Sequence, residues 1–335
     1  MTRVRILGLM ILGLLILAAI IGISYRAIEA SVDARRFPQE GKSVDIGGYK
    51  LNIDCTGQGT PTVILEAGLE VPASGWRLVQ PDIAKFTRVC SYDRAGYGWS
   101  DPGPMPRTST QIATELHTLL QNAGEKPPYV LVGHSFGAVN VRVYNGLYGS
   151  EIAGMVLVEG GPDELKLPAS IKKLSDADLR RRQRDRAWAP IRYSLGITRF
   201  LARKQIDDLA LPLVNRESSY VRLKPQFVEA TTSEVEKLAL FDPRGRQELE
   251  AAGTLGDKPL IVLIAGTGMW GLPLMSQDWV DLRKTWVDGQ MQLAHQLSTR
   301  GKSSIVSGST HMIPYERPDA IVSAVREVYA AVKSN

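Results

Sequence analysis

The chain begins with one long apolar stretch. Ile6–Ile23 runs for 18 residues without a charged residue, Pro, Asn or Gln. At about 1.5 Å per helical residue this covers roughly 27 Å, close to the hydrocarbon thickness of a bilayer. Arg3 and Arg5 precede the stretch, and Ser24-Tyr25-Arg26 follows it without the small residues of a strong cleavage site. We predict an uncleaved signal anchor within residues 1–30; the alternative is a signal peptide cleaved after Ala30.

Beyond residue 41 the pattern changes to short apolar runs that alternate with helical periodicity. Such alternation predicts an α/β fold with a mostly parallel sheet. The predicted strands are Ser43–Ile46, Tyr49–Cys55, Pro61–Leu65, Arg88–Tyr92, Tyr129–Gly133, Met155–Val158, Pro259–Ala265 and Ser303–Val306. The predicted helices are Ser74–Lys85, Ser109–Ala123, Phe136–Tyr148, Ser276–Arg300 and Pro318–Val332.

Residues 162–255 interrupt this rhythm. They are charged, helix-like and interrupted by Pro168, Pro190, Pro212, Pro225 and Pro243. We predict an inserted helical cap on a single sheet domain formed by residues 41–161 and 256–335. The insertion holds an arginine cluster at residues 180–186, which is typical of a solvated helix face; contact with anionic lipid is the alternative.

Gly133-His134-Ser135-Phe136-Gly137 fits the G-x-S-x-G motif. It follows a predicted strand and precedes a predicted helix, which is the context that the motif requires. The turn raises the serine hydroxyl into the open, and the helix N-terminus adds positive potential. This pattern predicts Ser135 as a catalytic nucleophile.

A serine nucleophile requires a general base, and the chain has only four histidines. His134 lies inside the turn itself, and His117 and His295 fall within predicted helices. His311 follows the last predicted strand, where sites form in open α/β sheets. Elimination therefore indicates His311 as the base.

The third member of a triad is a carboxylate that orients the histidine. The usual position follows Pro259–Ala265, but no carboxylate occurs there before Asp278. Glu159 comes directly after Met155–Val158, and Asp163 follows four residues later. The order Ser, acid, His holds for all three. Glu159 is our preferred candidate, with Asp163 and Asp278 as the alternatives.

An oxyanion hole needs two backbone N–H donors. One is expected from Phe136, the residue after the nucleophile. The second is expected from the loop after Pro61–Leu65, where Gly68 allows the chain to turn and direct the N–H of Leu69 inward.

Other kinds of site find little support. Residues 266–271 match G-x-G-x-x-G, but Leu272-Pro273 follows where a dinucleotide fingerprint opens a helix. The sequence contains no phosphate-binding G-x-x-x-x-G-K-[ST] motif and no paired Cys/His cluster for a metal. The net charge of +5 comes without a basic stripe. We therefore expect no cofactor, no metal and no nucleic-acid partner.

Four stretches together resemble the α/β-hydrolase superfamily over residues 41–333. They are residues 63–68, residues 92–100 with a D-x-R-G-x-G-x-S-like segment, the motif at Ser135, and residues 308–311 with 316–318. The resemblance implies an eight-stranded sheet with a helical cap between strands six and seven. It also implies that Cys55 and Cys90 lie on neighbouring strands, where a disulfide is possible in an exported domain.

Two positions depart from the family pattern. Ala67 replaces a frequent histidine before the oxyanion glycine, and Met269 stands where most relatives carry the triad aspartate. Certain haloalkane dehalogenases place a glutamate after strand six, which matches Glu159. Those enzymes use an aspartate nucleophile, so Ser135 argues against dehalogenation and epoxide opening.

The expected function is hydrolysis of a small-molecule carboxylic ester through an acyl-enzyme. The chain would be anchored by one helix with a cytoplasmic N-terminus and an extracytoplasmic catalytic domain. The alternatives are an amidase, peptidase or thioesterase on the same triad, or a binding protein that has lost catalysis.

Overall fold

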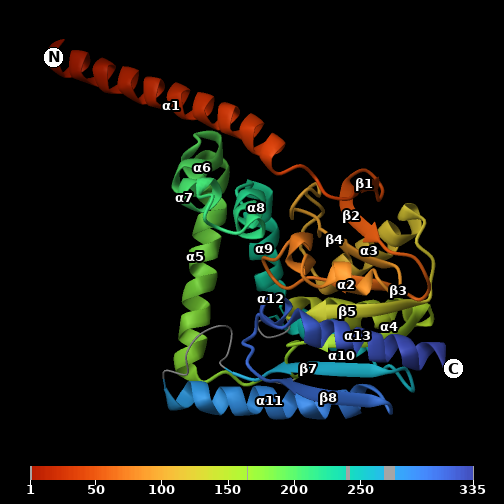
Figure 1. The fold of residues 1–335 in the computed structure, drawn as a ribbon. Helices are drawn as coiled ribbons and strands as arrows, with labels where there is room; N and C mark the ends of the chain where they lie inside the picture. The colour runs from red at the N-terminus through yellow and green to blue at the C-terminus, as the bar shows by residue number, and fades with distance from the viewer. Residues whose placement is uncertain (1, 164, 239–241, 268–275, 335) are drawn as a thin grey trace.

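The computed structural model describes residues 2–163, 165–238, 242–267 and 276–334. Its centre is an eight-stranded sheet in the order β1-β2-β4-β3-β5-β6-β7-β8. The pairs β1–β2 and β2–β4 are antiparallel, and all other neighbours are parallel. The predicted α/β-hydrolase sheet with a cap inserted between strands six and seven is confirmed (Figure 1).

The strands follow the apolar runs of the sequence closely. Their bounds are β1 (Lys42–Asp45), β2 (Lys50–Thr56), β3 (Thr62–Glu66), β4 (Val89–Tyr92), β5 (Tyr129–His134), β6 (Ile152–Val158), β7 (Leu260–Ala265) and β8 (Gly301–Val306). All residues of β3, β5 and β7 are buried, because helices cover both faces of the sheet.

Two apolar layers flank the sheet. On one face, α3 (Ser109–Ala123), α4 (Phe136–Tyr148) and α11 (Gln277–Leu297) contribute buried side chains to the core. On the other face, α2 (Gln80–Ile83) and α13 (Pro318–Lys333) do the same. Because the parallel strands run in the same direction, their carboxyl ends lie at one edge of the sheet, where the following loops can carry a site.

One predicted helix is wrong. Residues 74–85 do not form a single helix but a 3-10 turn, η1 (Ala73–Trp76), followed by the short α2. Pro81 occupies the second position of α2. Since a proline lacks an N–H and excludes the preceding turn, it is tolerated at a helix start and not in the interior.

The cap fills the segment between β6 and β7. Its helices are α5 (Ala169–Ser194), α6 (Ile197–Leu201), α7 (Arg203–Asp207), α8 (Leu213–Val221), α9 (Pro225–Lys237) and α10 (Pro243–Ala251). In Figure 1, α5 and α9 stand side by side, with α6 and α7 at one end of α5 and α8 at the same end of α9.

The N-terminal apolar stretch is part of a longer helix, α1 (Thr2–Arg36). By length and composition α1 is able to cross a membrane, with a mean hydropathy of 3.0 and no buried residues in its most apolar window. Its N-terminal part projects beyond the rest of the molecule, while its C-terminal part passes over α6 (Figure 1).

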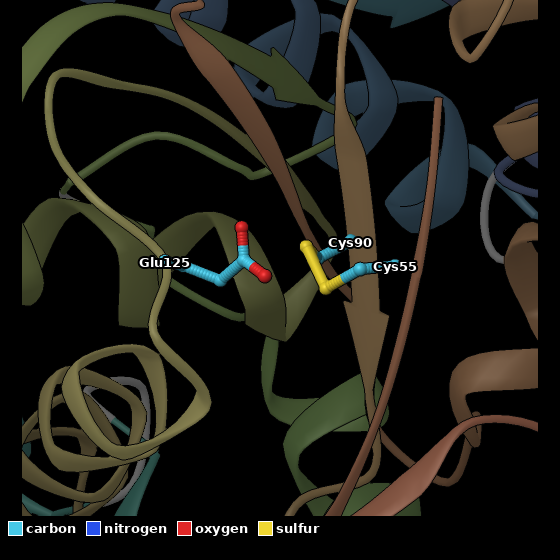
Figure 2. A group of neighbouring side chains, drawn as sticks. All are labelled: Cys55, Cys90 and Glu125. Carbon is cyan, nitrogen blue, oxygen red and sulfur yellow. A yellow bond between two sulfur atoms is a disulfide. The ribbon is translucent and has the colours of Figure 1, made fainter. Parts of the chain in front are cut away.

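A disulfide joins β2 to β4. Cys55 and Cys90 are paired in the strand register, with Cα atoms 4.1 Å apart and an S–S distance of 2.08 Å. Figure 2 shows the bridge beside Glu125. The structure therefore contains the cross-strand bond that the family resemblance allows.

Candidate active site

Ser135 lies at the turn between β5 and α4. Its φ of 54° and ψ of −119° place it outside the regions favoured by residues with a Cβ. The turn closes because its flanking residues are glycines: a Cβ on Gly133 would lie 2.5 Å from the Gly137 oxygen, and one on Gly137 would lie 2.3 Å from the Glu66 oxygen. The two glycines of the motif thus permit the strained serine.

His311 and Glu159 extend from Ser135 in a continuous hydrogen-bond chain. The Nε2 atom of His311 lies 2.9 Å from Ser135 Oγ, and its Nδ1 atom lies 3.1 Å from Glu159 Oε2. A carboxylate only accepts, so Nδ1–H donates to Glu159 and Nε2 is free to accept the serine proton. This tautomer is the one that a general base needs.

The surroundings of Glu159 keep it ionised. Burial raises the pKa of its carboxyl, but hydrogen bonds from His311, from the Ala265 N–H at 2.7 Å and from Gln290 outweigh it, and the net pKa is lowered. Trp286 also donates to Oε2, at 3.1 Å. A negative charge is therefore maintained next to His311.

Backbone strain gathers at this place. The described residues include three non-glycine residues with positive φ, namely Glu70, Ser135 and Glu159. Two of them belong to the hydrogen-bond chain, and the third lies in the loop after β3. Such conformations persist where the surrounding structure holds them and cluster at active sites.

The loop after β3 lies against Ser135. A Cβ on Gly68 would be 3.3 Å from the Ser135 Cβ and 3.0 Å from His134 Nδ1. The Val71 N–H bonds to the Gly68 oxygen at 3.2 Å and closes a turn around Leu69. The missing side chain of Gly68 suits this close approach, and the positive φ of the turn falls on Glu70.

Comparison with known proteins agrees with this architecture. A model of the alpha/beta hydrolase family matches residues 63–324. The chain belongs to this family. It is 38% identical over 98 residues to the uncharacterised protein YqjL of Bacillus subtilis, covering 29% of this chain and 39% of YqjL. It thus spans well under two thirds of that relative.

Solved structures share the fold of this hydrolase family member. The epoxide hydrolase CorEH superposes with a TM-score of 0.64 at 17% identity, over 87% of this chain and 98% of that one. A thermophilic esterase from Thermogutta terrifontis superposes with a TM-score of 0.61 at 18% identity, over 87% and 98%. At such identities the likeness shows the fold alone.

The two alternative acids of the hydrolase site lie elsewhere. Asp163 forms a bidentate ion pair with Arg142, at 2.5 and 3.0 Å. Asp278 accepts a hydrogen bond from Ser170. Of the three carboxylates that the sequence left open, the structure brings only Glu159 to His311. Residues 268–271, which include Met269 and most of the G-x-G-x-x-G match, lie outside the described residues.

Arg94 supports the loop that carries Leu69, a role that the sequence did not reveal. Its buried guanidinium donates to the backbone oxygens of Ala67 and Gly68 at 2.7 and 2.9 Å. It also pairs with Glu66 at 2.8 Å and, from the cap helix α9, with Glu234 at 3.0 Å. Because a peptide unit is planar and trans, holding the Gly68 oxygen toward Arg94 directs the Leu69 N–H the opposite way.

His134 supports the histidine loop. Its Nε2–H donates to the backbone oxygen of His311 at 2.9 Å. Burial, with a further contribution from nearby His311, lowers the pKa of His134 to about 3, so the ring is neutral near pH 7. The sequence placed His134 only as a residue turned away from the hydroxyl.

Within the part of the chain that the structure describes, two groups of side chains have metal-ligand spacing, but their atoms are already engaged. Cys55 and Cys90 share a disulfide beside Glu125, whose carboxylate oxygens both bond to Arg88 at 2.7 Å (Figure 2). The second group, Glu29, Asp33 and Asp207, surrounds the guanidinium of Arg199.

Proposed function

We propose that this chain is a membrane-anchored serine hydrolase that cleaves carboxylic esters. The nucleophile is Ser135 and the general base is His311. Glu159 orients the His311 ring and stabilises its protonated form. The observation that carries the proposal is the unbroken chain of hydrogen bonds from Ser135 Oγ through His311 to Glu159. Such a series of hydrogen-bonded side chains acts on substrates with an acyl group that can be transferred to the serine.

The reaction follows from this geometry. His311 Nε2 takes the proton as Ser135 Oγ attacks the ester carbonyl, and the N–H groups of Leu69 and Phe136 stabilise the oxyanion. The imidazolium then protonates the departing alcohol and leaves an acyl-serine ester. In the second half His311 deprotonates a water molecule, which attacks the acyl carbonyl. The imidazolium then returns the proton to Ser135 Oγ as the carboxylic acid leaves.

The identity of the nucleophile separates this function from epoxide opening, despite the likeness to CorEH in fold. An aspartate that opens an epoxide forms an ester, which water cleaves. A serine that opened an epoxide would form an ether, which the same base and oxyanion donors cannot hydrolyse. Ser135 therefore favours substrates whose carbonyl accepts the serine oxygen.

Membrane anchoring is the second half of the proposal. The apolar length of α1, with Arg3 and Arg5 before it, supports a single span with a cytoplasmic N-terminus. The disulfide between Cys55 and Cys90 suits a domain on the oxidising side of that membrane.

Fluorophosphonate labelling of the full chain in detergent tests the catalytic proposal. We expect the probe to modify Ser135 and Ser135→Ala to remove both labelling and ester turnover while the far-UV circular dichroism is unchanged. Labelling at another serine, or undiminished turnover by Ser135→Ala, would overturn the assignment. A folded wild-type protein that takes no label would favour a binding protein.

A substrate panel separates the hydrolase classes. Esters, thioesters and amides with the same acyl group report on one acylation machinery with different leaving groups. We expect kcat/KM to be highest for the oxyester and to vary with acyl length. If the amide or the thioester were the better substrate, the proposed triad would stand and the proposed substrate class would change from esters to amides or thioesters.

A further inference from the structure

The helix α1 does not end where its apolar stretch ends but packs onto the cap. A Cβ on Gly22 would lie 2.2 Å from the Leu195 oxygen, and one on Gly196 would lie 2.5 Å from the Gly22 oxygen. The two backbones therefore touch directly, which only glycine permits. One turn further, the rings of Tyr25 and Phe200 meet edge to face, with centroids 6.4 Å apart.

A buried ion-pair cluster fixes the same contact. The Arg199 side chain, on α6, is only 4% exposed and pairs with Asp33 at 2.7 Å and with Glu29 at 2.8 Å, both on α1. Asp207 of α7 completes the cluster at 2.8 Å from Arg199. A guanidinium shared by three carboxylates holds its partners in one geometry, so α1 and the cap behave as one unit.

The position of this contact along α1 determines how far the cap lies from the hydrocarbon layer of the membrane. Gly22 belongs to the last turn of the apolar stretch Ile6–Ile23. If that stretch spans the hydrocarbon layer, the corner between α5 and α6 lies within one turn, about 5 Å, of its edge. Figure 1 shows α6 and α7 directly beneath α1 at this level.

The cap exposes apolar side chains at that corner. Ile197 and Phe200 are 40% and 50% exposed, Leu201 is 65% exposed, and Leu209 is 80% exposed. Large apolar residues grouped in this way on the surface mark an interaction site. The neighbouring cations are Arg203, whose guanidinium lies 4.0 Å from the centre of the Phe200 ring, and the exposed Lys204.

The acidic groups nearby are largely neutralised. Asp207 pairs with Arg199 and with Arg36. Asp208 is exposed and accepts a hydrogen bond from the Ala210 N–H. Further along the cap, Arg181, Arg182 and Arg186 pair with carboxylates, whereas Arg180 and Arg184 form no ion pair with any described residue. Residues 24–36 and 195–211, which form the contact between α1 and the cap, hold six basic side chains (Arg26, Arg35, Arg36, Arg199, Arg203 and Lys204) and four acidic ones (Glu29, Asp33, Asp207 and Asp208). The surface beside α1 is therefore apolar with a small excess of positive charge.

We propose that the cap tip, defined as Ile197, Phe200, Leu201, Arg203, Lys204 and Leu209, docks into the headgroup layer of an anionic bilayer. The proposal rests on α1 being a membrane anchor. Apolar side chains enter the boundary of the hydrocarbon, and Arg203 and Lys204 bind lipid phosphates. The cap is thereby held on the membrane, next to lipid-soluble substrates.

Spin labels on the full chain test the docking. The two native cysteines form a disulfide, so a single introduced cysteine reports one position. Leu201→Cys samples the cap tip, Ile16→Cys samples the apolar stretch, and the exposed Ser323→Cys on α13 samples the far side. In phosphatidylcholine–phosphatidylglycerol nanodiscs we compare the accessibility of each label to oxygen and to a water-soluble nickel chelate.

We expect the oxygen-to-nickel ratio of the label at 201 to lie below that at 16 and several-fold above that at 323. A water-exposed label at 201 together with a lipid-exposed label at 16 would overturn the docking and leave the anchor standing. A water-exposed label at 16 would overturn the anchor and the docking together. Neither outcome bears on fluorophosphonate labelling of Ser135.

Charge is tested separately. With the label at 201, replacing phosphatidylglycerol by phosphatidylcholine and introducing Arg203→Gln with Lys204→Gln are both expected to lower the oxygen-to-nickel ratio. The matched control is Arg326→Gln, since Arg326 lies 4.1 Å from the Phe86 ring centre on the far side of the molecule. A ratio unaffected by the cap-tip pair would overturn the headgroup contact.

Discussion

The ring of His134 donates a hydrogen bond to the backbone oxygen of His311, at 2.9 Å. The residue before Ser135 therefore holds the loop that carries His311. The ring is fully buried and neutral, with its pKa lowered to about 3. Because the buried ring is neutral in the folded protein, the stability of the fold that holds this contact depends on pH.

We predict that stability falls as the pH is lowered from 7 to 5. Between about pH 6.5 and 3 the unfolded chain protonates His134 and the folded chain does not, so stability rises with pH in this window. The expected loss from this residue is about 2 kcal/mol. Urea unfolding in detergent at both pH values measures it, and His134→Gln is expected to lose less than wild type. An equal loss in the variant would exclude His134 as the source.

The second prediction concerns the carboxylate next to His311. Glu159→Gln retains the size of the side chain, but its amide donates to Nδ1 and stabilises the wrong histidine tautomer. We expect kcat to fall by about 10³–10⁴-fold, as for other triads that lose their acid. Asp163→Asn and Asp278→Asn serve as matched controls, with activity expected within a factor of about two because neither residue touches His311. A large effect in a control would reassign the acid.

The third prediction concerns the link between the cap and the oxyanion loop. Glu234→Gln weakens the buried pair with Arg94, which positions the oxygens of Ala67 and Gly68. We expect a loss of about 3 kcal/mol in stability, because a buried charge loses its partner. Displacement of the Leu69 N–H should lower kcat by roughly tenfold to a hundredfold with a smaller change in KM.

Glu236→Gln is the control for this change. Glu236 lies on the same helix but pairs with the half-buried Arg186 at 3.1 Å. Its loss is expected to change stability by less than about 1 kcal/mol and to leave kcat unaltered. If Glu234→Gln lowered the melting temperature without changing kcat, the role of Arg94 would be limited to stabilising the cap. It would then not position the loop that carries Leu69.

The fourth prediction concerns the disulfide. Cys55 and Cys90 are separated by 35 residues in the sequence, so the bond restricts the unfolded chain. Replacing both cysteines by alanine is expected to lower the free energy of unfolding by about 3–4 kcal/mol. A reducing agent should produce a similar shift in the wild type and none in the double variant. A shift in the double variant would show that the reducing agent acts elsewhere.

The sequence by itself predicted the architecture and two neighbouring members of the hydrogen-bond chain, Ser135 and His311. Alternating apolar runs predict buried strands and covering helices because these patterns depend only on local periodicity. Ser135 and His311 could be predicted as partners because a strained turn and a strand-end loop have local signatures. The apolar stretch of α1 is likewise a local property of composition.

Tertiary structure decided the remaining partners. Three carboxylates satisfied the order along the chain, and only the packing of β6 beside β7 brings Glu159 to His311. The roles of Arg94 and His134 depend on contacts between residues 26 to 177 positions apart, for which no spacing rule exists. The docking of α1 onto the cap arises in the same way, because Gly22 and Gly196 meet only after the chain has folded.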